Sequence, residues 1–401
     1  MPRCMSNTCF AAAAVLLAAV AICGPAALGA DDAAETASWP VYHGDPALSG
    51  AALTTLPDSL SALWRYNAGS GVGQTPVVGG GSIFVVTDAG EIHAITMTGK
   101  RIWRKGVDGD ADAGTNSAAR LHRFTTPPML ADGAVVVGTS GGWLHALEVR
   151  DGSTRWKYRV GESIKGSANR LPPEGGLGPS VVVISQTDGV VHRIDLASGR
   201  AVWTSQPVAR SDGSPGVGNG FLAFGSCDSA LHVLSTSNGV MSGTLGLGDE
   251  GQIAGGVAVS GDLVFAGDRG GTIVCADAVK SKVVWTNHVA RGEAFATPAI
   301  AGDRVVTGAS DGFVHCLDRA GGKVLWRFEA GDNVLSPVVA GDKVVVAAGG
   351  TLYLLRTSDG TRLWAASAGD LISSPAVCCG KVIVGTDDGS VIMYGPAGPA
   401  R

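Results

Sequence analysis

Charged side chains are scarce in this sequence, and the basic ones form no cluster. Charged residues make up only 16% of the 401 residues, and 35 Asp and Glu outnumber 30 Lys and Arg. A protein that binds nucleic acid needs a basic surface that neutralises phosphate groups. Because this chain has no such surface pattern, we expect no nucleic-acid partner.

Cysteine is scarce as well. Of the eight cysteines, Cys4, Cys9 and Cys23 lie within the first 30 residues. The other five have neither the spacing of a zinc site nor that of a dense disulfide framework. A chain of this length can bury a core that is large enough to fold without such cross-links. The five cysteines are Cys227, Cys275, Cys316, Cys378 and Cys379.

The chain lacks an apolar run of the roughly 20 residues that a membrane-spanning helix needs. Its one long apolar stretch, residues 10–23, follows a single charge at Arg3 and precedes the small residues that end at Ala30. This is the pattern of a secretory signal peptide that is cleaved near Ala30. We therefore expect an exported protein, periplasmic or secreted, with no membrane span.

Lipid anchoring of the exported chain at Cys23 is not favoured. Acylated cysteines follow a small residue, whereas Cys23 follows the bulky Ile22. Removal of the first 30 residues also removes Arg3, which leaves 29 basic and 35 acidic side chains and a net charge of −6. The mature protein is therefore expected to be mildly acidic.

Glycine, in contrast, is abundant, with 60 residues, and it marks an internal repeat. A sequence repeat of about 40 residues occurs seven times, and an eighth copy is present in a weaker form. It consists of a small residue and Pro, a β-branched run, an Asp-Gly turn, a strand with His or Tyr, and Gly-x-x-x-Trp. In the seventh copy the four β-type segments are residues 336–340, 343–347, 351–355 and 362–365.

Four short antiparallel strands form a small sheet that cannot bury both of its faces alone. Stacking such sheets around an axis buries the faces and leaves only short edges, which is a β-propeller. The sequence therefore predicts an all-β, eight-bladed β-propeller of four-stranded antiparallel blades, present as a monomer. We expect a signal peptide at 1–30, a lead-in segment at 31–59, the propeller at 60–395 and a tail at 396–401.

The tryptophans count the blades and predict how the ring closes. Six repeats end on Trp, and Gly243 takes that position in a weaker repeat. Trp64 precedes the first full repeat, whereas the last repeat stops without a Trp strand. The strand around Trp64 should therefore complete the last blade. One Trp can bury roughly 150–250 Å², enough to hold neighbouring blades together. The expected docking residues are Trp64, Trp103, Trp156, Trp203, Trp285, Trp326 and Trp364.

Two segments resemble the tryptophan-docking motif of quinoprotein propellers, Ala-x-Asp-x-x-x-Gly-x-x-x-Trp. They run from Ala146 to Trp156 and from Cys316 to Trp326. The chain thus resembles the family of propellers with pyrroloquinoline-quinone (PQQ)-like repeats, over residues 60–395. The family includes quinone-dependent dehydrogenases and an eight-bladed outer-membrane assembly factor, and this chain resembles the assembly-factor branch more. The resemblance implies that each indole is wedged between blades with its N–H bonded.

Two connections are longer than the others. From Trp103 to Pro128 the chain takes 25 residues, where 11–13 are usual, so residues 105–126 contain an insertion. The alternation of strand directions places this insertion on the same face as the Asp-Gly turns, where family propellers bind ligands around the channel mouth. The second insertion, 171–179, is a first-to-second-strand turn and belongs to the opposite face. Long loops on a rigid scaffold are where function tends to be placed.

The first insertion contains oxygen-bearing side chains at alternating positions, which resembles a calcium loop. Its glycine, Gly114, falls at position seven rather than six, and Ala119 stands where a calcium loop has an acidic residue. A polar loop without metal is therefore the favoured interpretation, with calcium as the alternative. The candidate calcium ligands are Asp108, Asp110, Asp112 and Asn116.

Three further features suggest a metal, cofactor or glycan site, but each also has a structural explanation. Five histidines share one third-strand position with Tyr353 and should lie on the order of 10 Å apart around the ring, too far to bind one metal ion. The adjacent Cys378 and Cys379 resemble the cysteine pair of quinone-dependent alcohol dehydrogenases, but they align with a turn opposite the usual cofactor mouth. Trp143 could stack on a glycan, or pack between blades. The five histidines are His93, His145, His192, His232 and His315.

The chain length favours a scaffold over an enzyme. Eight blades use nearly all of the mature chain and leave no second catalytic layer. We therefore expect a non-catalytic scaffold that binds other envelope proteins, including a role in outer-membrane protein assembly, and no cofactor. The alternatives are a dehydrogenase that depends on PQQ and calcium, and a glycan or peptide binder. Seven charged residues precede first strands and could bind a ligand at the channel mouth: Arg123, Lys165, Arg210, Glu250, Glu293, Asp332 and Asp370.

Overall fold

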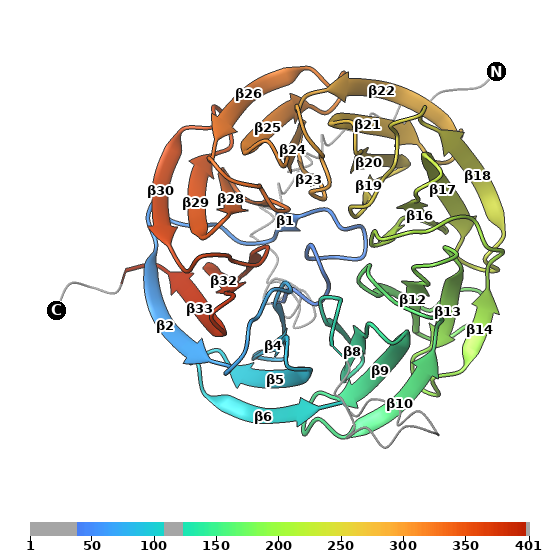
Figure 1. The fold of residues 1–401 in the computed structure, drawn as a ribbon, viewed down its shortest axis with the longest axis horizontal. Helices are drawn as coiled ribbons and strands as arrows, with labels where there is room; N and C mark the ends of the chain where they lie inside the picture. The colour runs from blue at the N-terminus through green and yellow to red at the C-terminus, as the bar shows by residue number, and fades with distance from the viewer. Residues whose placement is uncertain (1–37, 108–122, 398–401) are drawn as a thin grey trace, which may run out of the picture.

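The structure is a computed structural model that describes residues 38–107 and 123–397. The described chain is built from strands alone, arranged as eight sheets around a central axis (Figure 1). Each blade has four antiparallel strands, and β1 adds a short parallel strand to the inner edge of blade 7. This confirms the predicted eight-bladed β-propeller. No helix in the described ranges is long and apolar enough to cross a membrane.

The strands of the first four blades follow one another in the chain, from the channel outward. Blade 1 contains β3 (Val77–Gly79), β4 (Ser82–Val86), β5 (Glu91–Thr96) and β6 (Arg101–Gly106). Blade 2 contains β7 (Met129–Ala131), β8 (Ala134–Gly138), β9 (Trp143–Glu148) and β10 (Thr154–Arg159). Blade 3 contains β11 (Asn169–Leu171), β12 (Ser180–Ile184), β13 (Val191–Asp195) and β14 (Ala201–Thr204). Blade 4 contains β15 (Gly216–Val217), β16 (Phe221–Gly225), β17 (Ala230–Ser235) and β18 (Met241–Gly246).

The remaining blades repeat this order, except that the last takes its outer strand from the N-terminal part of the chain. Blade 5 contains β19 (Ala258–Ser260), β20 (Leu263–Gly267), β21 (Thr272–Asp277) and β22 (Lys282–His288). Blade 6 contains β23 (Ala299–Ala301), β24 (Arg304–Gly308), β25 (Phe313–Asp318) and β26 (Val324–Glu329). Blade 7 contains β27 (Val338–Ala340), β28 (Lys343–Ala348), β29 (Thr351–Arg356) and β30 (Arg362–Ser367), with β1 (Ala51–Ala52) beside β27. Blade 8 contains β31 (Ala376–Cys378), β32 (Lys381–Gly385), β33 (Ser390–Gly395) and β2 (Ser61–Asn67).

The predicted strand limits of blade 7 need two corrections. The first strand begins at Val338 rather than at residue 336, because Pro337 has no N–H to donate to a ladder. The fourth strand extends to Ser367 rather than to residue 365, because it remains paired with β29 up to Thr351. Apolar side chains of the inner three strands are buried between blades, whereas the fourth strands are mostly exposed or half-buried apart from docking residues such as Trp326.

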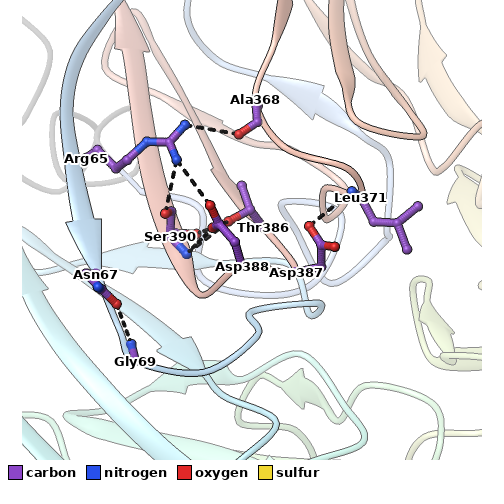
Figure 2. Close-up of polar contacts among 9 residues, drawn as sticks. All are labelled: Arg65, Asn67, Gly69, Ala368, Leu371, Thr386, Asp387, Asp388 and Ser390. Atoms are coloured by element: carbon purple, nitrogen blue, oxygen red, sulfur yellow. Dashed lines mark hydrogen bonds and ion pairs between the residues drawn. The ribbon is translucent and has the colours of Figure 1, made fainter.

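The ring closes as the tryptophan pattern predicts. Strand β2 pairs antiparallel with β33, so the two ends of the propeller share blade 8. Arg65 of β2 reinforces the closure, because its guanidinium reaches the Asp388 carboxylate at 3.3 Å, the Ser390 hydroxyl at 3.2 Å and the Ala368 carbonyl of blade 7 at 3.1 Å (Figure 2). In the same turn Thr386 donates to Asp388, and the Leu371 amide donates to the Asp387 carboxylate at 3.1 Å. One side chain therefore links the closing strand to the rest of blade 8 and to blade 7.

Each docking tryptophan contacts the next blade, and six of the seven do so in the same way. The indole N–H of Trp103 donates to the Val149 carbonyl of blade 2 at 2.8 Å, and the indole covers Gly152, whose φ is +71°. Six of the seven tryptophans donate to a backbone carbonyl of the following blade in this manner. Trp364 instead packs edge-on against Tyr394 of blade 8, with 5.6 Å between ring centroids. A β-bulge directly before the tryptophan position recurs in the outer strand pair of all eight blades.

The histidine position faces the neighbouring blade rather than a shared centre. Tyr66 bonds to the ring of His93 at 2.9 Å, and Tyr158 bonds to that of His192 at 3.1 Å. Tyr353, at the same position in blade 7, donates instead to the Ala330 carbonyl at 3.1 Å. In the described part of the chain, no group of three or more His, Cys, Asp or Glu is placed to hold a metal ion. His93 and His192 are therefore interblade packing residues, whereas His232 bonds to Ser226 within its own blade.

These buried histidines predict a loss of stability in mild acid. Burial is the largest cause that lowers the pKa of His93, His192 and His315 below the ordinary value near 6.5. Protonation therefore favours the unfolded chain. Their contribution is fully present above about pH 6.5 and is lost as the pH falls toward the lower folded values. Denaturant unfolding at about pH 7.5 and about pH 5.5 should show lower stability at the acidic value.

The control for this effect is His315→Phe, which keeps an aromatic ring but cannot titrate. The variant should lose part of the stability difference between the two pH values. A wild-type stability that does not fall in acid would contradict the assignment. So would a fall in acid that His315→Phe leaves unchanged.

The second insertion lies beside a buried arginine. Residues 171–179 connect β11 to β12, and Glu174 of this turn lies 3.9 Å from the guanidinium of Arg193 on β13. The Arg193 side chain is completely buried and donates to the Thr236 carbonyl at 2.8 Å. Glu174 accepts a 2.8 Å hydrogen bond from the Thr236 hydroxyl as well. The insertion therefore places a carboxylate over a buried arginine between blades 3 and 4.

Candidate functional site

The candidate site is the central channel, at the face that carries the connections between blades. Here each fourth-to-first-strand connection contacts the second-to-third-strand turn, as the strand directions predict. Backbone bonds join Asp88 to Gly71 at 2.8 Å and Gln186 to Ser163 at 3.0 Å. We call this side of the ring the mouth face. The described ends of the first insertion, Val107 and Arg123, bond on this face to Gly90 and Ser140. The candidate calcium ligands Asp108, Asp110, Asp112 and Asn116 lie outside the described residues.

A cavity of about 450 Å³ occupies the channel at the mouth face. Its wall comes from the segments before the first strands, which contribute glycine backbone and small hydroxyl side chains. Such a wall offers hydrogen bonds to a polar group, and Phe295 and Leu335 add apolar surface beside them. The hydroxyl-bearing residues of the wall are Thr75, Ser214, Ser310, Ser336 and Ser374.

Three charged side chains line this cavity, and two of them are in the predicted set. Lys165 and Glu293 are the predicted pair, and Asp212 is the third. Glu293 lies 3.4 Å from Arg269, and Asp212 lies 2.9 Å from Arg210. The cavity thus carries charges of both signs at its rim.

The other predicted mouth residues lie on the loops around the cavity without lining it. Arg123 forms an ion pair with Asp88 at 3.7 Å, and Arg210 reaches the cavity only through its bond to Asp212. Glu250, Asp332 and Asp370 are exposed on their loops. Sequence spacing identifies the loop on which a residue lies, but the direction of each side chain depends on loop conformation.

The floor of the cavity is Tyr42, from the lead-in segment. Its hydroxyl group bonds to the hydroxyl of Thr297 at 2.9 Å and to that of Ser336 at 2.7 Å. These two hydroxyls are themselves acceptors for the amides of Gly256 and Thr297. Burial raises the pKa of Tyr42, so it remains a neutral phenol that can donate one of these bonds. The floor is therefore tied to blades 6 and 7.

Tyr42 belongs to a segment, residues 38–55, that runs around the inside of the channel on the side away from the mouth. We call this segment the strap. Its carbonyl groups accept hydrogen bonds from the amides of the first strands, at 2.7–2.9 Å. The donors are Val78 of blade 1, Leu130 of blade 2, Val217 of blade 4, Val259 of blade 5, Ile300 of blade 6 and Val339 of blade 7.

Blades 3 and 8 join the strap through side chains. In blade 3 the amide of the Asn169 side chain donates to the Pro46 carbonyl at 2.7 Å. In blade 8 the backbone amide of Gly380 donates to the Thr54 hydroxyl at 2.8 Å. The strap thus contacts the innermost strand or turn of every blade. Sequence reasoning identified residues 31–59 only as a lead-in segment and missed this role.

Buried polar contacts hold the strap in place. The ring of His43 lies 2.7 Å from the Leu48 carbonyl and 2.8 Å from the Pro337 carbonyl of blade 7. Asp45 accepts bonds from the amide and hydroxyl groups of Ser49, which close the turn between them. Just beyond the strap, Asp58 forms a 2.9 Å ion pair with the buried Lys343 of blade 7.

The described cavity residues do not fit the quinone and calcium that the quinoprotein resemblance raises. Such a site needs a cation held by several oxygen ligands and an aromatic surface beneath the cofactor. Asp212 is already bonded to Arg210 and to Gln186, and the floor ring of Tyr42 is fixed by two hydroxyls. Cys379 lies in the turn between β31 and β32, on the face away from the mouth, and both it and Cys378 are free thiols.

Trp143 is not an open stacking surface. Lys157 lies over its ring at 4.9 Å, and Arg159 lies 5.3 Å from the same ring centre. Both cations come from β10 of the same blade. The structure therefore gives no support to glycan stacking at this residue.

Comparison with known proteins identifies the family. Residues 54–183, 187–315 and 311–399 match the family described as "Outer membrane protein assembly factor BamB". BamB of Yersinia pestis is 27% identical over 200 residues, which cover 49% of this chain and 48% of that protein. BamB of Escherichia coli is 28% identical over 166 residues, which cover 41% of this chain and 40% of that protein. The chain thus spans about half the length of the curated relatives it matches.

Solved structures show the same fold. BamB from Moraxella catarrhalis superposes with a TM-score of 0.68 at 19% identity, covering 86% of this chain and 99% of that one. A quinohemoprotein alcohol dehydrogenase from Comamonas testosteroni superposes with a TM-score of 0.71 at 16% identity, covering 92% and 82%. Both structures share the propeller, so fold does not separate a scaffold from an enzyme. The sequence match across the blades shows the family: this chain belongs to the family of the outer membrane protein assembly factor BamB.

Proposed function

We propose that this protein is a non-catalytic, protein-binding scaffold of the cell envelope that takes part in the assembly of outer membrane proteins. The observation that carries the proposal is the family match, which extends from residue 54 to residue 399 and so covers all eight blades. The closed ring supports it, because a rigid propeller offers a broad, preformed surface for another protein. The apolar leader in residues 1–30 is consistent with export to that compartment.

The mouth face is the surface we assign to partner binding. It carries the two described ends of the first insertion, at Val107 and Arg123, together with the charged loops before the first strands and the cavity. The opposite end of the channel is already occupied by the strap. Loops on a rigid scaffold, with mixed charge and a central hollow, are typical of binding faces.

Site-specific crosslinking in cells tests this assignment. A photoreactive amino acid at the exposed Glu250, on the mouth face, should crosslink to an envelope protein. The control position is Asp303, whose side chain is 84% exposed in a first-to-second-strand turn of the opposite face. Deletion of the gene should also lower the amount of folded β-barrel proteins in the outer membrane. Normal amounts of these proteins, or crosslinks only from position 303, would contradict the proposal.

A further inference from the structure

The first strands of the ring form a binding site for an extended peptide, and the strap is its resident occupant. Each first strand pairs with a second strand on one edge and faces the channel with the other. An unpaired strand edge presents backbone amides that need partners. The strap supplies carbonyl groups to these amides in six blades. Recognition through backbone groups is the physical basis of peptide binding at strand edges.

The contacts of the strap follow the order of the blades. Its first contact is Trp39 with Val78 of blade 1, and its last is Thr54 with Gly380 of blade 8. Between them, Pro46 and Gly50 meet blades 4 and 7. The strap therefore runs once around the inside of the ring, in the direction in which the blades follow one another.

A partly formed ring cannot bind the whole strap. Its partners are spread from residue 78 to residue 380, so the complete set exists only after blade 8 has formed. Closing such long loops is entropically costly, and long-range contacts of this kind form late in folding. The strap also leads directly into β2, the strand that closes blade 8. Docking of the strap and closure of the ring are thus coupled by the chain itself.

We propose that residues 38–55 act as a separable lock: a peptide ligand of the ring, carried by the chain, that docks last and holds the closed propeller. The strap also forms the cavity floor through Tyr42, so the lock completes the cavity as it closes the ring. This proposal concerns the propeller itself and does not depend on the partner proposed above.

Cutting the chain behind the strap tests the lock. Asp58 and Ser59 are both exposed, between the buried residues Leu56 and Leu60, and a protease site inserted between them should be cleavable in the folded protein. The cut leaves the strap held by non-covalent contacts alone. The melting temperature of the cleaved protein should then fall and should depend on protein concentration, because strap binding has become intermolecular. An added synthetic peptide of residues 38–58 should restore it.

A second cut serves as the matched control. Gly175 and Gly176 lie in the exposed turn of blade 3, with open space around their Cα atoms. A protease site inserted there cuts the chain without freeing the strap, so the added peptide should not change the melting temperature. A peptide with Tyr42→Phe and His43→Ala should bind the strap-cleaved protein at least about tenfold more weakly, because three hydrogen bonds to the ring and one within the strap are lost.

Two results of the cleavage experiment would overturn the lock. One is a melting temperature that stays unchanged after the strap has been cut and removed, since the strap would then not stabilise the closed propeller. The other is a ring that loses its β-structure on cleavage and does not recover with peptide, since the strap would then be an inseparable part of the core.

Hydrogen exchange on the intact chain gives an independent measurement. Six first-strand amides donate hydrogen bonds to carbonyl groups of the strap. If the strap opens as a unit, these six amides should exchange together and at least about tenfold faster than the third-strand amides. Tyr42→Phe should accelerate this set and leave the third strands unchanged. Exchange of the first strands at the rate of the third strands would show that the strap opens only when the whole protein unfolds, against the proposal.

Discussion

Replacing Trp326 by alanine is expected to lower the free energy of unfolding by about 3–5 kcal/mol. The side chain is 8% exposed and lies between blades 6 and 7, where its N–H donates to the Thr357 carbonyl at 2.9 Å. Its ring fits against Gly360, where a Cβ atom would lie only 2.6 Å from the indole Cε3. The glycine leaves no side chain that could fill the space, so the substitution should leave a cavity and an unpaired carbonyl.

The matched control for this prediction is Leu325→Ala. Leu325 is adjacent on the same strand but 45% exposed, so its truncation should cost less than about 0.5 kcal/mol. Urea unfolding of the two variants and the wild type measures both values. A loss of less than about 1 kcal/mol for Trp326→Ala would contradict the docking role of the tryptophan.

Replacing Glu174 by alanine should lower the free energy of unfolding by about 1–3 kcal/mol. Burial lowers the pKa of Arg193, and the Glu174 carboxylate opposes this effect. Within the described chain the Nε and Nη2 atoms of Arg193 have no hydrogen-bond partner, so loss of the carboxylate leaves its charge poorly compensated. The value lies below that of a fully buried pair because Glu174 is 38% exposed and 3.9 Å away.

The cost of Glu174→Ala should nearly disappear when the arginine is removed. Arg193→Met replaces a buried charge by an apolar chain of similar length and should be neutral or stabilising. In that background, Glu174→Ala should cost less than about 0.5 kcal/mol, so the double-mutant cycle isolates the pair. Equal losses from Glu174→Ala in both backgrounds would show that the turn itself, and not the charge, is what matters.

The sequence was sufficient for the ring but not for the strap. Tryptophans at a fixed position indicate strands and blades because each indole needs the same apolar pocket. Trp64 likewise predicts the closing strand. The strap binds mostly through carbonyl groups, which every residue has, so no side-chain pattern marks it. Tyr42 and His43 are isolated polar residues in the sequence and acquire their partners in the ring only when residues 255 to 294 positions away are brought beside them.

The site was harder to predict than the fold for a related reason. Position before a first strand was enough to place Lys165 and Glu293 at the cavity, but Glu250 and Asp370 share that position and point elsewhere. Arg193 lies in an ordinary third strand, and only the fold shows that this position is sealed from water. Repetition fixes the backbone, whereas the irregular side chains depend on contacts that occur once.

The strap has a consequence for the passage of a polypeptide through the central channel. Because Tyr42 lines the cavity and the strap contacts all eight blades on the side away from the mouth, we expect the cavity to open toward the mouth face alone. A polypeptide is then not expected to pass through the ring from one side to the other. A bound segment would enter as an end or a loop and would leave by the same side.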